Sequence, residues 1–330
     1  MKKTSSFVVL LLVVTTIVLF QCTATHNNKN IIQKGNVAYD FSFATLALKF
    51  FETNDSLYLQ KIATLQATEH LLNHSRRFNS GVPNNSGLEL VTYLLSFGNS
   101  EEELARFKRN LDFAKKHIAK TDIPQKIALQ FLPKDFTFSS SLFFTFGYDL
   151  GVAYGNNASL NLAHPFFLEN RNELIFFAIH ELHHAGFIML KGYMPSLNIT
   201  TFREMAELIE YLTHLEGMAT LAPLEIRMKE NAMNTHRDYV VLQDAELLKE
   251  FTKQFFEIYF HFKNNPDSII TNDDWSKIHI LSDGKRLFYI VGAHMAQTID
   301  QEFGREKLVS LIAQPSEKFI TTYLEIIERR

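Results

Sequence analysis

The sequence has a single cysteine, Cys22, in 330 residues, and only 8 prolines and 13 glycines. One cysteine excludes both an internal disulfide framework and the cysteine-rich zinc modules. A net charge of −3 supplies no positive field for a nucleic-acid backbone, so we expect no nucleic-acid partner. Because cysteine is so scarce, any metal ion must be held by histidine and carboxylate side chains. Phenylalanine, in contrast, is abundant: 30 residues are enough to fill a sizeable core.

The N-terminus has the pattern of an export signal. Lys2 and Lys3 precede an apolar run over residues 7–20. This run is roughly 14 residues long, whereas a membrane-spanning helix needs about 20. Its length and position are typical of the hydrophobic region of a signal peptide. Cys22 follows the run, and this arrangement resembles the cleavage box of bacterial lipoproteins, in which the cysteine becomes the lipidated first residue.

We therefore predict a signal peptide over residues 1–21 and a polar tether over residues 22–39. The protein is expected to be exported to the bacterial cell envelope and anchored to the membrane through a lipid on Cys22. The alternative is an ordinary secretory signal that is cleaved near Thr23 or Thr25. Both alternatives place the mature protein outside the cytoplasm.

Hydrophobic periodicity divides the rest of the chain, from residue 40, into three parts of one domain. Apolar residues recur at helical spacing through residues 40–125. In residues 126–190, alternating runs such as 136–138 and 158–162 predict short strands, and an apolar helix follows them. Residues 191–330 are again helical in pattern. This order predicts an α+β fold that is mostly α, with a small sheet beside one apolar helix and a helical C-terminal lobe.

The apolar helix is predicted to run from about Asn170 to Gly186. Asn170 is a suitable N-cap residue, and Glu173 could reach back to it in a capping box. Gly186 is a natural place for the helix to end. The residues between these ends are so apolar that we expect the helix to be buried.

This helix contains an H-E-x-x-H motif. His180 and His184 are four residues apart, so they lie on one face of the helix, about 6 Å apart along its axis, and both imidazoles can bind one ion. Glu181 points about 100° away and is placed to take a proton from water rather than to bind the ion. Two buried histidines and a glutamate without partners would cost several kcal/mol, which favours a Zn²⁺ site over a polar cluster in the core. His183 is expected at the rim or behind the ligands.

A catalytic zinc site needs a third protein ligand and an open position. The helix predicted from Thr201 onward offers several glutamates. Glu216 is favoured, because Gly217 beside it allows close backbone approach and helix packing. Glu204, twenty residues after His184, is the alternative, although its charged neighbours are typical of a solvated face.

These motifs together resemble those of the gluzincin zinc metallopeptidases. The matching residues are His180-Glu181-Leu182-His183-His184 and Glu216-Gly217-Met218-Ala219, since the gluzincin glutamate ligand often lies in a Glu-Gly-x-Ala context. More closely, roughly residues 40–323 resemble a domain-of-unknown-function family of zinc-dependent peptidases from bacterial envelopes. That similarity includes Tyr289-x-x-Gly292-x-x-Met295 and Phe303-Gly304-Arg305-Glu306.

The resemblance implies a zincin-like fold in which His180, His184 and Glu216 hold Zn²⁺ and a peptide or protein is the substrate. The implied reaction is hydrolysis by metal-activated water, with Glu181 as the general base. Tyr289, near Gly292, is the candidate donor to the oxyanion; the alternative is a tyrosine of the core.

Two further interpretations stay open at this point. The strand predicted over residues 153–162 either pairs with the substrate backbone or is an ordinary edge strand. The alternative function is a non-catalytic, lipid-anchored binding or scaffold protein with a structural zinc in a zincin fold. A hydrolase that acts on a bond other than a peptide bond is a third possibility.

Overall fold

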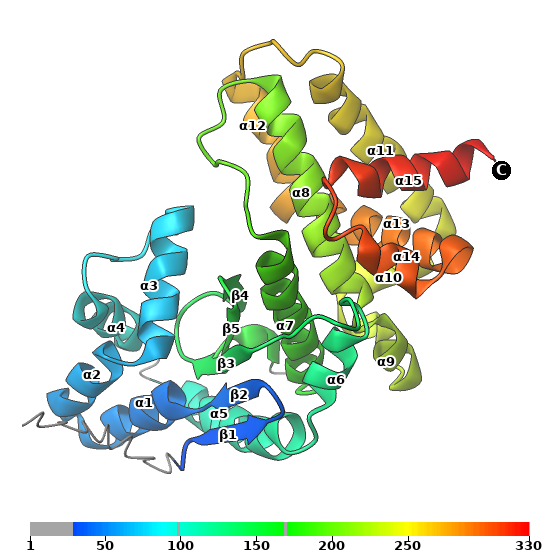
Figure 1. The fold of residues 1–330 in the computed structure, drawn as a ribbon. Helices are drawn as coiled ribbons and strands as arrows, with labels where there is room; N and C mark the ends of the chain where they lie inside the picture. Colours follow the sequence, from blue (N-terminus) through cyan, green and yellow to red (C-terminus); the bar gives the residue numbers. More distant parts are fainter. Residues whose placement is uncertain (1–28, 98–99, 168–169, 330) are drawn as a thin grey trace, which may run out of the picture.

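The computed structural model describes residues 29–97, 100–167 and 170–329 (Figure 1). The predicted signal peptide and Cys22 lie outside the described residues.

The strands are β1 (Ile31–Lys34), β2 (Val37–Asp40), β3 (Ser140–Thr145), β4 (Gly151–Tyr154) and β5 (Asn157–Asn161). The helices are α1 (Ser42–Thr53), α2 (Ser56–Ala63), α3 (Gln66–Phe78), α4 (Gly87–Ser96), α5 (Glu101–Phe113), α6 (Ile123–Leu129), α7 (Glu173–Lys191), α8 (Phe202–Leu221), α9 (Leu224–Lys229), α10 (Arg237–Gln243), α11 (Ala245–Lys263), α12 (Asn272–His279), α13 (Leu287–Phe303), α14 (Arg305–Ser310) and α15 (Glu317–Glu328). Short 3₁₀ or π segments are η1 (Ala114–Ala119), η2 (Pro165–Phe167), η3 (Met233–Thr235) and η4 (Ile280–Gly284). The fold is α+β and mostly α, which confirms the predicted class.

The five strands form one mixed sheet in the order β1-β2-β3-β5-β4. Strands β2, β3 and β5 are parallel, and the outer pairs β1–β2 and β5–β4 are antiparallel. Residues 31–40 therefore belong to the folded domain, and the prediction of a tether up to residue 39 was wrong for that part. The strand predicted over 136–138 is not formed either; β3 begins at Ser140 instead.

Helix α7 starts and ends later than the sequence predicted. Its N-cap is Asn172, without a capping side chain, and the carboxylate of Glu173 pairs with Arg227 rather than with Asn170. The helix passes through Gly186 and ends at Gly192, which takes the left-handed conformation with φ +69°. Gly186 has a packing role: a β-carbon there would lie 2.3 Å from a methyl carbon of Leu132.

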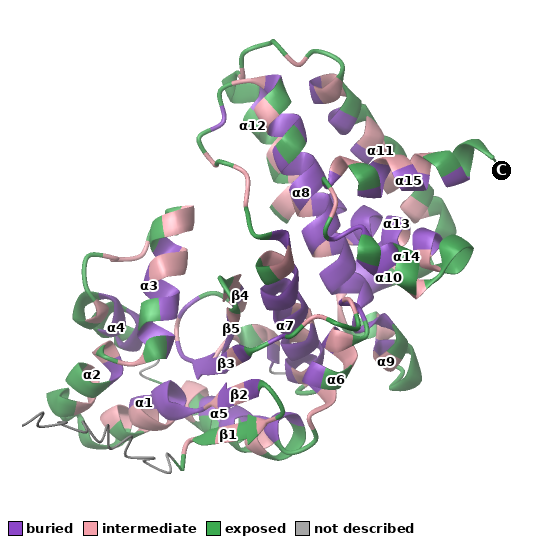
Figure 2. Ribbon diagram, in the orientation of Figure 1, coloured by how far each residue is buried: buried purple, intermediate pink, exposed green. Residues whose placement is uncertain are grey.

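Helix α7 is shared by two hydrophobic cores. One core lies between the sheet and the N-terminal helices, and it contains Leu174, Ala178 and Leu182 of α7. The other lies among α8, α11, α13 and α15, and it contains Ile179 and Phe187 of the same helix. Figure 2 shows α7 buried along most of its length between the two halves. Among the described residues α7 alone is long and apolar enough to cross a membrane, and 72% of that apolar window is buried inside the protein.

Helices α8 and α13 approach closely at two glycines. A β-carbon on Gly217 would lie 2.3 Å from the carbonyl carbon of Gly292, so neither helix could carry a side chain there without moving. Helix α8 begins where predicted, because Thr201 and Glu204 form a capping box. The crossing places Glu216, next to Gly217, and Tyr289, one turn before Gly292, near the same part of α7.

Candidate metal centre

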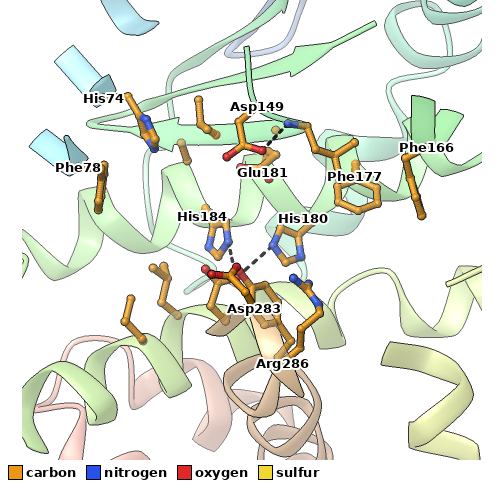
Figure 3. A pocket seen from close by; sticks show the side chains of 18 of the residues that line it. His74, Phe78, Asp149, Phe166, Phe177, His180, Glu181, His184, Asp283 and Arg286 are labelled. Carbon is orange, nitrogen blue, oxygen red and sulfur yellow. Dashed lines mark hydrogen bonds and ion pairs between the residues drawn. The ribbon is translucent and has the colours of Figure 1, made fainter. Parts of the chain in front are cut away.

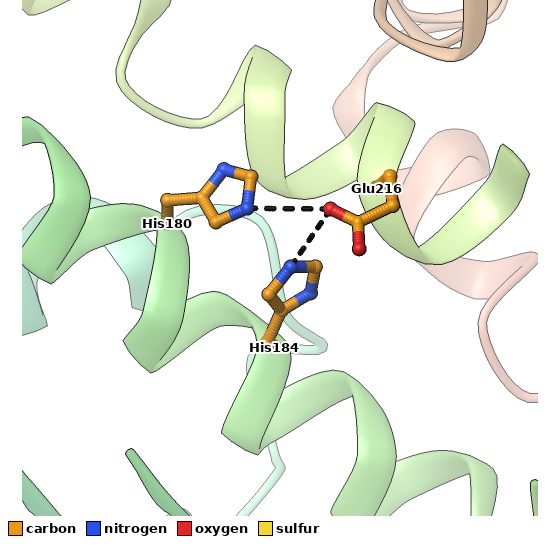
Figure 4. A group of neighbouring side chains, drawn as sticks. All are labelled: His180, His184 and Glu216. Carbon is orange, nitrogen blue, oxygen red and sulfur yellow. Dashed lines mark hydrogen bonds and ion pairs between the residues drawn. The ribbon is translucent and has the colours of Figure 1, made fainter. Parts of the chain in front are cut away.

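Three predicted ligands meet between α7 and α8. The Nε2 atom of His184 lies 3.0 Å from Oε2 of Glu216, and Nε2 of His180 lies 3.3 Å from the same oxygen (Figure 4). All three ligand atoms lie within 4.8 Å of one another. The two histidines come from adjacent turns of α7, and Glu216 comes from the facing side of α8. The structure therefore brings together His180, His184 and Glu216.

This arrangement fits a zinc ion. Four ligands at about 2.0–2.1 Å in a tetrahedron lie about 3.3 Å from one another, close to the two distances found here. Imidazole nitrogens with one carboxylate oxygen are a donor set that zinc accepts. Both histidines turn Nε2, rather than Nδ1, toward the carboxylate. The geometry and the donor set both match the predicted site.

Glu204, the alternative third ligand, is used elsewhere. Its Oε2 accepts hydrogen bonds from the backbone N–H groups of Thr200 and Thr201, at 2.8 and 2.9 Å, and from both hydroxyl groups. These bonds hold the pKa of the Glu204 carboxyl at about 2. They cap the first turn of α8, several turns before Glu216. The structure thus does not bring Glu204 to the two histidines.

Burial and mutual charge set the ionisation of the three groups. Burial lowers the pKa of His180 to about 4, so this imidazole is neutral near pH 7. Burial also acts against charge on His184, but the carboxylate of Glu216 outweighs it and the pKa of His184 is raised. Burial alone would raise the pKa of Glu216; His184 and His180 reverse that effect and hold it well below its usual range. A metal ion needs the Glu216 carboxylate anion and both imidazoles in their neutral form, so its binding would displace the proton that Glu216 favours on His184.

Glu181 lies beside these ligands and is not one of them. It is 5% exposed, and its Oε1 packs over the start of β4, where a β-carbon on Gly151 would come within 2.7 Å of it. Burial raises the pKa of Glu181 to about 8. The carboxyl group lines the same cavity as the two histidines, so it is placed for proton transfer.

His183 is fully buried rather than at the rim, so that part of the prediction was wrong. Its Nε2 lies 3.3 Å from the carbonyl oxygen of Phe131, just after α6, on the side of α7 away from the cavity. This contact joins α7 to the segment that follows α6.

The cluster opens into a cavity of about 600 Å³ (Figure 3). Strand β4 and helix α3 form one wall, and α7, α8 and the start of α13 form the other. Tyr289 lines this cavity, with its ring centroid 6.3 Å from that of His180 and 3.5 Å from the guanidinium carbon of Arg286. Its hydroxyl has no hydrogen-bond partner among the described residues. Burial raises the pKa of Tyr289 well above its usual value, so the hydroxyl keeps its proton.

Sequence reasoning missed several residues of the cavity. Arg286 precedes α13 and forms a bidentate pair with the buried Asp238, at 2.9 and 3.0 Å. His236 also lines the cavity, and its Nδ1 accepts the backbone N–H of Asp238 at 3.2 Å. Asp149 lies just before β4. These residues are far from the H-E-x-x-H motif in the sequence, and no local pattern marks them.

The comparison with protein families identifies the chain. Residues 23–330 match the family described as "Putative zinc dependent peptidase (DUF5700)", so the chain belongs to this family. The family found by resemblance in the sequence is thereby confirmed. No curated protein matches the chain, and no solved structure matches it. The family description supports zinc as the cofactor and a peptide or protein as the substrate, and the His-His-Glu cluster offers a site for that ion.

Proposed function

We propose that the protein is a gluzincin-type zinc peptidase. His180, His184 and Glu216 would hold Zn²⁺, and Glu181 would be the general base. The proposal rests chiefly on one observation: two histidines and a glutamate with zinc-ligand spacing lie beside a separate buried carboxyl group, at the edge of a cavity of about 600 Å³. Family membership gives the reaction class independently.

When bound, zinc would act as a Lewis acid toward the substrate carbonyl and would lower the pKa of water. Glu181 takes the proton from the attacking water while the water oxygen bonds to the carbonyl carbon. The same carboxyl group then gives this proton to the amide nitrogen as the C–N bond breaks. Burial of Glu181 favours its protonated form, which suits the second step. The anion that accepts the proton in the first step would be stabilised by the positive charge of bound zinc.

Tyr289 is the proposed donor to the oxyanion that develops on the carbonyl. Its hydroxyl group is protonated and lines the cavity beside His180. The guanidinium of Arg286, stacked on the tyrosine ring and held by Asp238, limits the positions of that ring. A preorganised donor of this kind is most effective in a site from which water is excluded.

The backbone of the substrate is proposed to pair with β4. The strand predicted over residues 153–162 is in fact a hairpin: β5 is interior to the sheet, and β4 is the edge strand. The backbone N–H of Asn161 donates to the carbonyl of Leu150, so by the alternation of an antiparallel pair Gly151 and Ala153 direct their backbone groups to the free edge. Both residues line the cavity.

The open cavity favours an enzyme over a scaffold with structural zinc. Structural zinc sites are closed, with four protein ligands. Here three candidate ligands meet among the described residues, and their free side faces the cavity. That arrangement leaves room for water and a substrate carbonyl.

Export and lipid anchoring are part of the proposal and rest on the N-terminal sequence alone. The charged and apolar segments before Cys22 support them. Labelled fatty acid should be incorporated by the full chain expressed in a bacterium, and the Cys22→Ala variant should not incorporate it.

The test is the Glu181→Gln variant, incubated with an unfolded protein of mixed sequence. Hydrolysis should fall at least a thousandfold, while metal analysis still finds about one zinc per chain. Glu204→Gln is the matched control, since it removes a carboxylate outside the cavity; it should keep its activity. Undiminished hydrolysis by Glu181→Gln would overturn the proposed mechanism.

A further inference from the structure

The two ends of the cavity differ in chemistry. On the side of His184 the wall consists of apolar side chains from α3, α7, the segment after α7, and α8: Phe78, Ile188, Met194, Leu212 and Leu215. Phe78 ends α3, Ile188 is one turn after His184 on α7, and Leu212 is one turn before Glu216 on α8. Except for Leu215, these side chains are only partly buried, so they keep apolar surface toward the cavity.

The opposite end of the cavity, on the side of His180, combines charged, polar and aromatic side chains. His236, Arg237, Asp283 and Arg286 line it, together with the rings of Phe166 and Phe177. Figure 3 shows that Phe78 and His74 lie on the His184 side and that Phe177, Phe166 and Arg286 lie on the His180 side. A bound chain that crosses the cavity would thus meet aliphatic side chains on one side of the candidate metal site and a mixture of aromatic and charged side chains on the other.

The direction of β4 indicates which part of a bound peptide would lie at the apolar end of the cavity. Gly151, the first residue of β4, packs against Glu181, whereas Ala153 borders a surface hollow with Ile188 and Met194. Strand β4 therefore runs from the catalytic carboxyl toward the apolar end. A chain that pairs with it antiparallel has its N-terminal part at the apolar end. Antiparallel pairing is the more stable kind per residue and the commoner one.

We propose that this apolar end is a substrate subsite, and that it selects a bulky apolar side chain on the residue immediately before the scissile bond. The inference rests on the proposed peptidase function and adds a substrate class to it. Side chains such as leucine, methionine or phenylalanine fit, because their burial against Ile188, Met194 and Leu212 removes apolar surface from water on both sides. An aspartate there would lose hydration against these apolar side chains.

The subsite has no charged side chain of its own among the residues named above. Two titratable groups of α3 lie on this side. His74 bonds through Nδ1 to the Tyr148 hydroxyl at 2.9 Å, and burial lowers its pKa to about 4, so it is neutral near pH 7. Arg77 borders the adjoining surface hollow with Ile188 and Met194, and its guanidinium donates to the carbonyl oxygen of Pro195 at 2.8 Å. The side chains that line the subsite itself are apolar, so we expect a preference for apolar residues.

The first arm of the test uses hydrolysis. The zinc-loaded protein is incubated with a library of peptides of mixed sequence, and the products are identified by mass spectrometry. Apolar residues before the cleaved bond should be favoured over aspartate by roughly tenfold to a hundredfold, the range expected for burial of one apolar side chain. Met194→Glu should reverse this preference toward lysine and arginine. Met228→Glu, the same change at an exposed position of α9, should not alter it.

The second arm measures binding without turnover. Two peptides that differ only in leucine or aspartate at that position are titrated calorimetrically into the Glu181→Gln protein. The leucine peptide should bind at least tenfold more tightly, and Met194→Glu in the same background should remove the difference. Preferential binding without any hydrolysis by the wild-type protein would support the subsite and contradict the proposed function.

Two outcomes would overturn the inference while leaving the peptidase intact. One is hydrolysis with equal use of apolar and acidic residues before the bond. The other is an apolar preference confined to the residue after the bond, which would mean that the bound chain runs in the opposite direction along β4.

Discussion

Gly151 lies directly beneath the carboxyl group of Glu181. A β-carbon at this position would meet Oε1 at 2.7 Å, the γ-carbon at 2.9 Å and the carboxyl carbon at 3.0 Å. Strand β4 thus contacts the candidate general base at Gly151, and only glycine, which has no β-carbon, leaves space there for the Glu181 side chain. The position of the base depends on the sheet as well as on its own helix.

Substitution of this glycine should therefore separate catalysis from metal binding. In Gly151→Ala the added methyl group pushes the Glu181 side chain away, and a displacement of about 1 Å can lower a rate by roughly a hundredfold. We expect kcat for peptide hydrolysis to fall by about that factor, while zinc content stays near one per chain. A variant with unchanged kcat would show that the contact does not position the base.

The contact between Gly217 and Gly292 should control the third ligand. In Gly217→Ala the methyl group would lie 2.3 Å from the backbone of α13, so α8 and α13 must move apart. Strain of this kind costs about 1–3 kcal/mol of stability. Glu216 moves with its neighbour, so zinc affinity should fall as well. Gly292→Ala should have the same two effects, measured by denaturant unfolding and competition with a chelator. Unchanged zinc affinity in both variants would contradict this account.

The H-E-x-x-H motif could be predicted from sequence because its meaning is local: a helix places residues four apart on one face whatever surrounds it. Gly217 likewise indicated Glu216, and the structure places this residue beside the two histidines. The end of α7 could not be predicted from the local sequence. Gly186 does not end the helix; it leaves room for the side chain of Leu132, some fifty residues earlier. The N-terminal strands were missed for a similar reason: β2 pairs with β3, and Val37 lies opposite Ser140.

Glu173 shows how a local pattern can mislead. It has the spacing of a capping box with Asn170, yet it forms a buried bidentate ion pair with Arg227, at 2.6 and 2.8 Å. The guanidinium lies between the rings of Phe176 and Tyr239. Only the folded chain brings α7 and α9 together, so sequence spacing had no means of indicating this pair. Tertiary contact overrode a favourable local signal.

This ion pair should be important for stability. Glu173→Gln leaves Arg227 charged and buried, so we expect the free energy of unfolding to fall by about 3–5 kcal/mol in urea titrations. Glu306→Gln removes one partner of the Lys134–Glu306 pair, whose side chains are 81% and 82% exposed, and should leave stability unchanged. Equal effects of the two substitutions would mean that burial does not determine the contribution of these pairs.

Acid should destabilise the protein through histidines such as His70. Burial and the nearby His74 lower the pKa of His70 to about 4, from about 6.5 in the unfolded chain. The unfolded state therefore binds more protons between these values. The stability contributed by neutral His70 is fully present above about pH 6.5 and is lost as the pH falls to about 4, on the order of 3 kcal/mol in total.

The measurement is the free energy of unfolding in urea at pH 7 and pH 4. The difference between the two should be smaller in His70→Leu than in the wild type, because one proton-binding site of the unfolded chain has been removed. An identical difference in the two proteins would show that His70 is not buried in its neutral form.

The central claim is that α7 and α8 together hold one zinc ion. Anomalous diffraction at the zinc absorption edge, on crystals of the zinc-loaded protein, tests it most directly. A single peak should lie about 2.0–2.2 Å from Nε2 of His180, Nε2 of His184 and a carboxylate oxygen of Glu216. The absence of a peak there, or a peak that other side chains hold, would contradict the account.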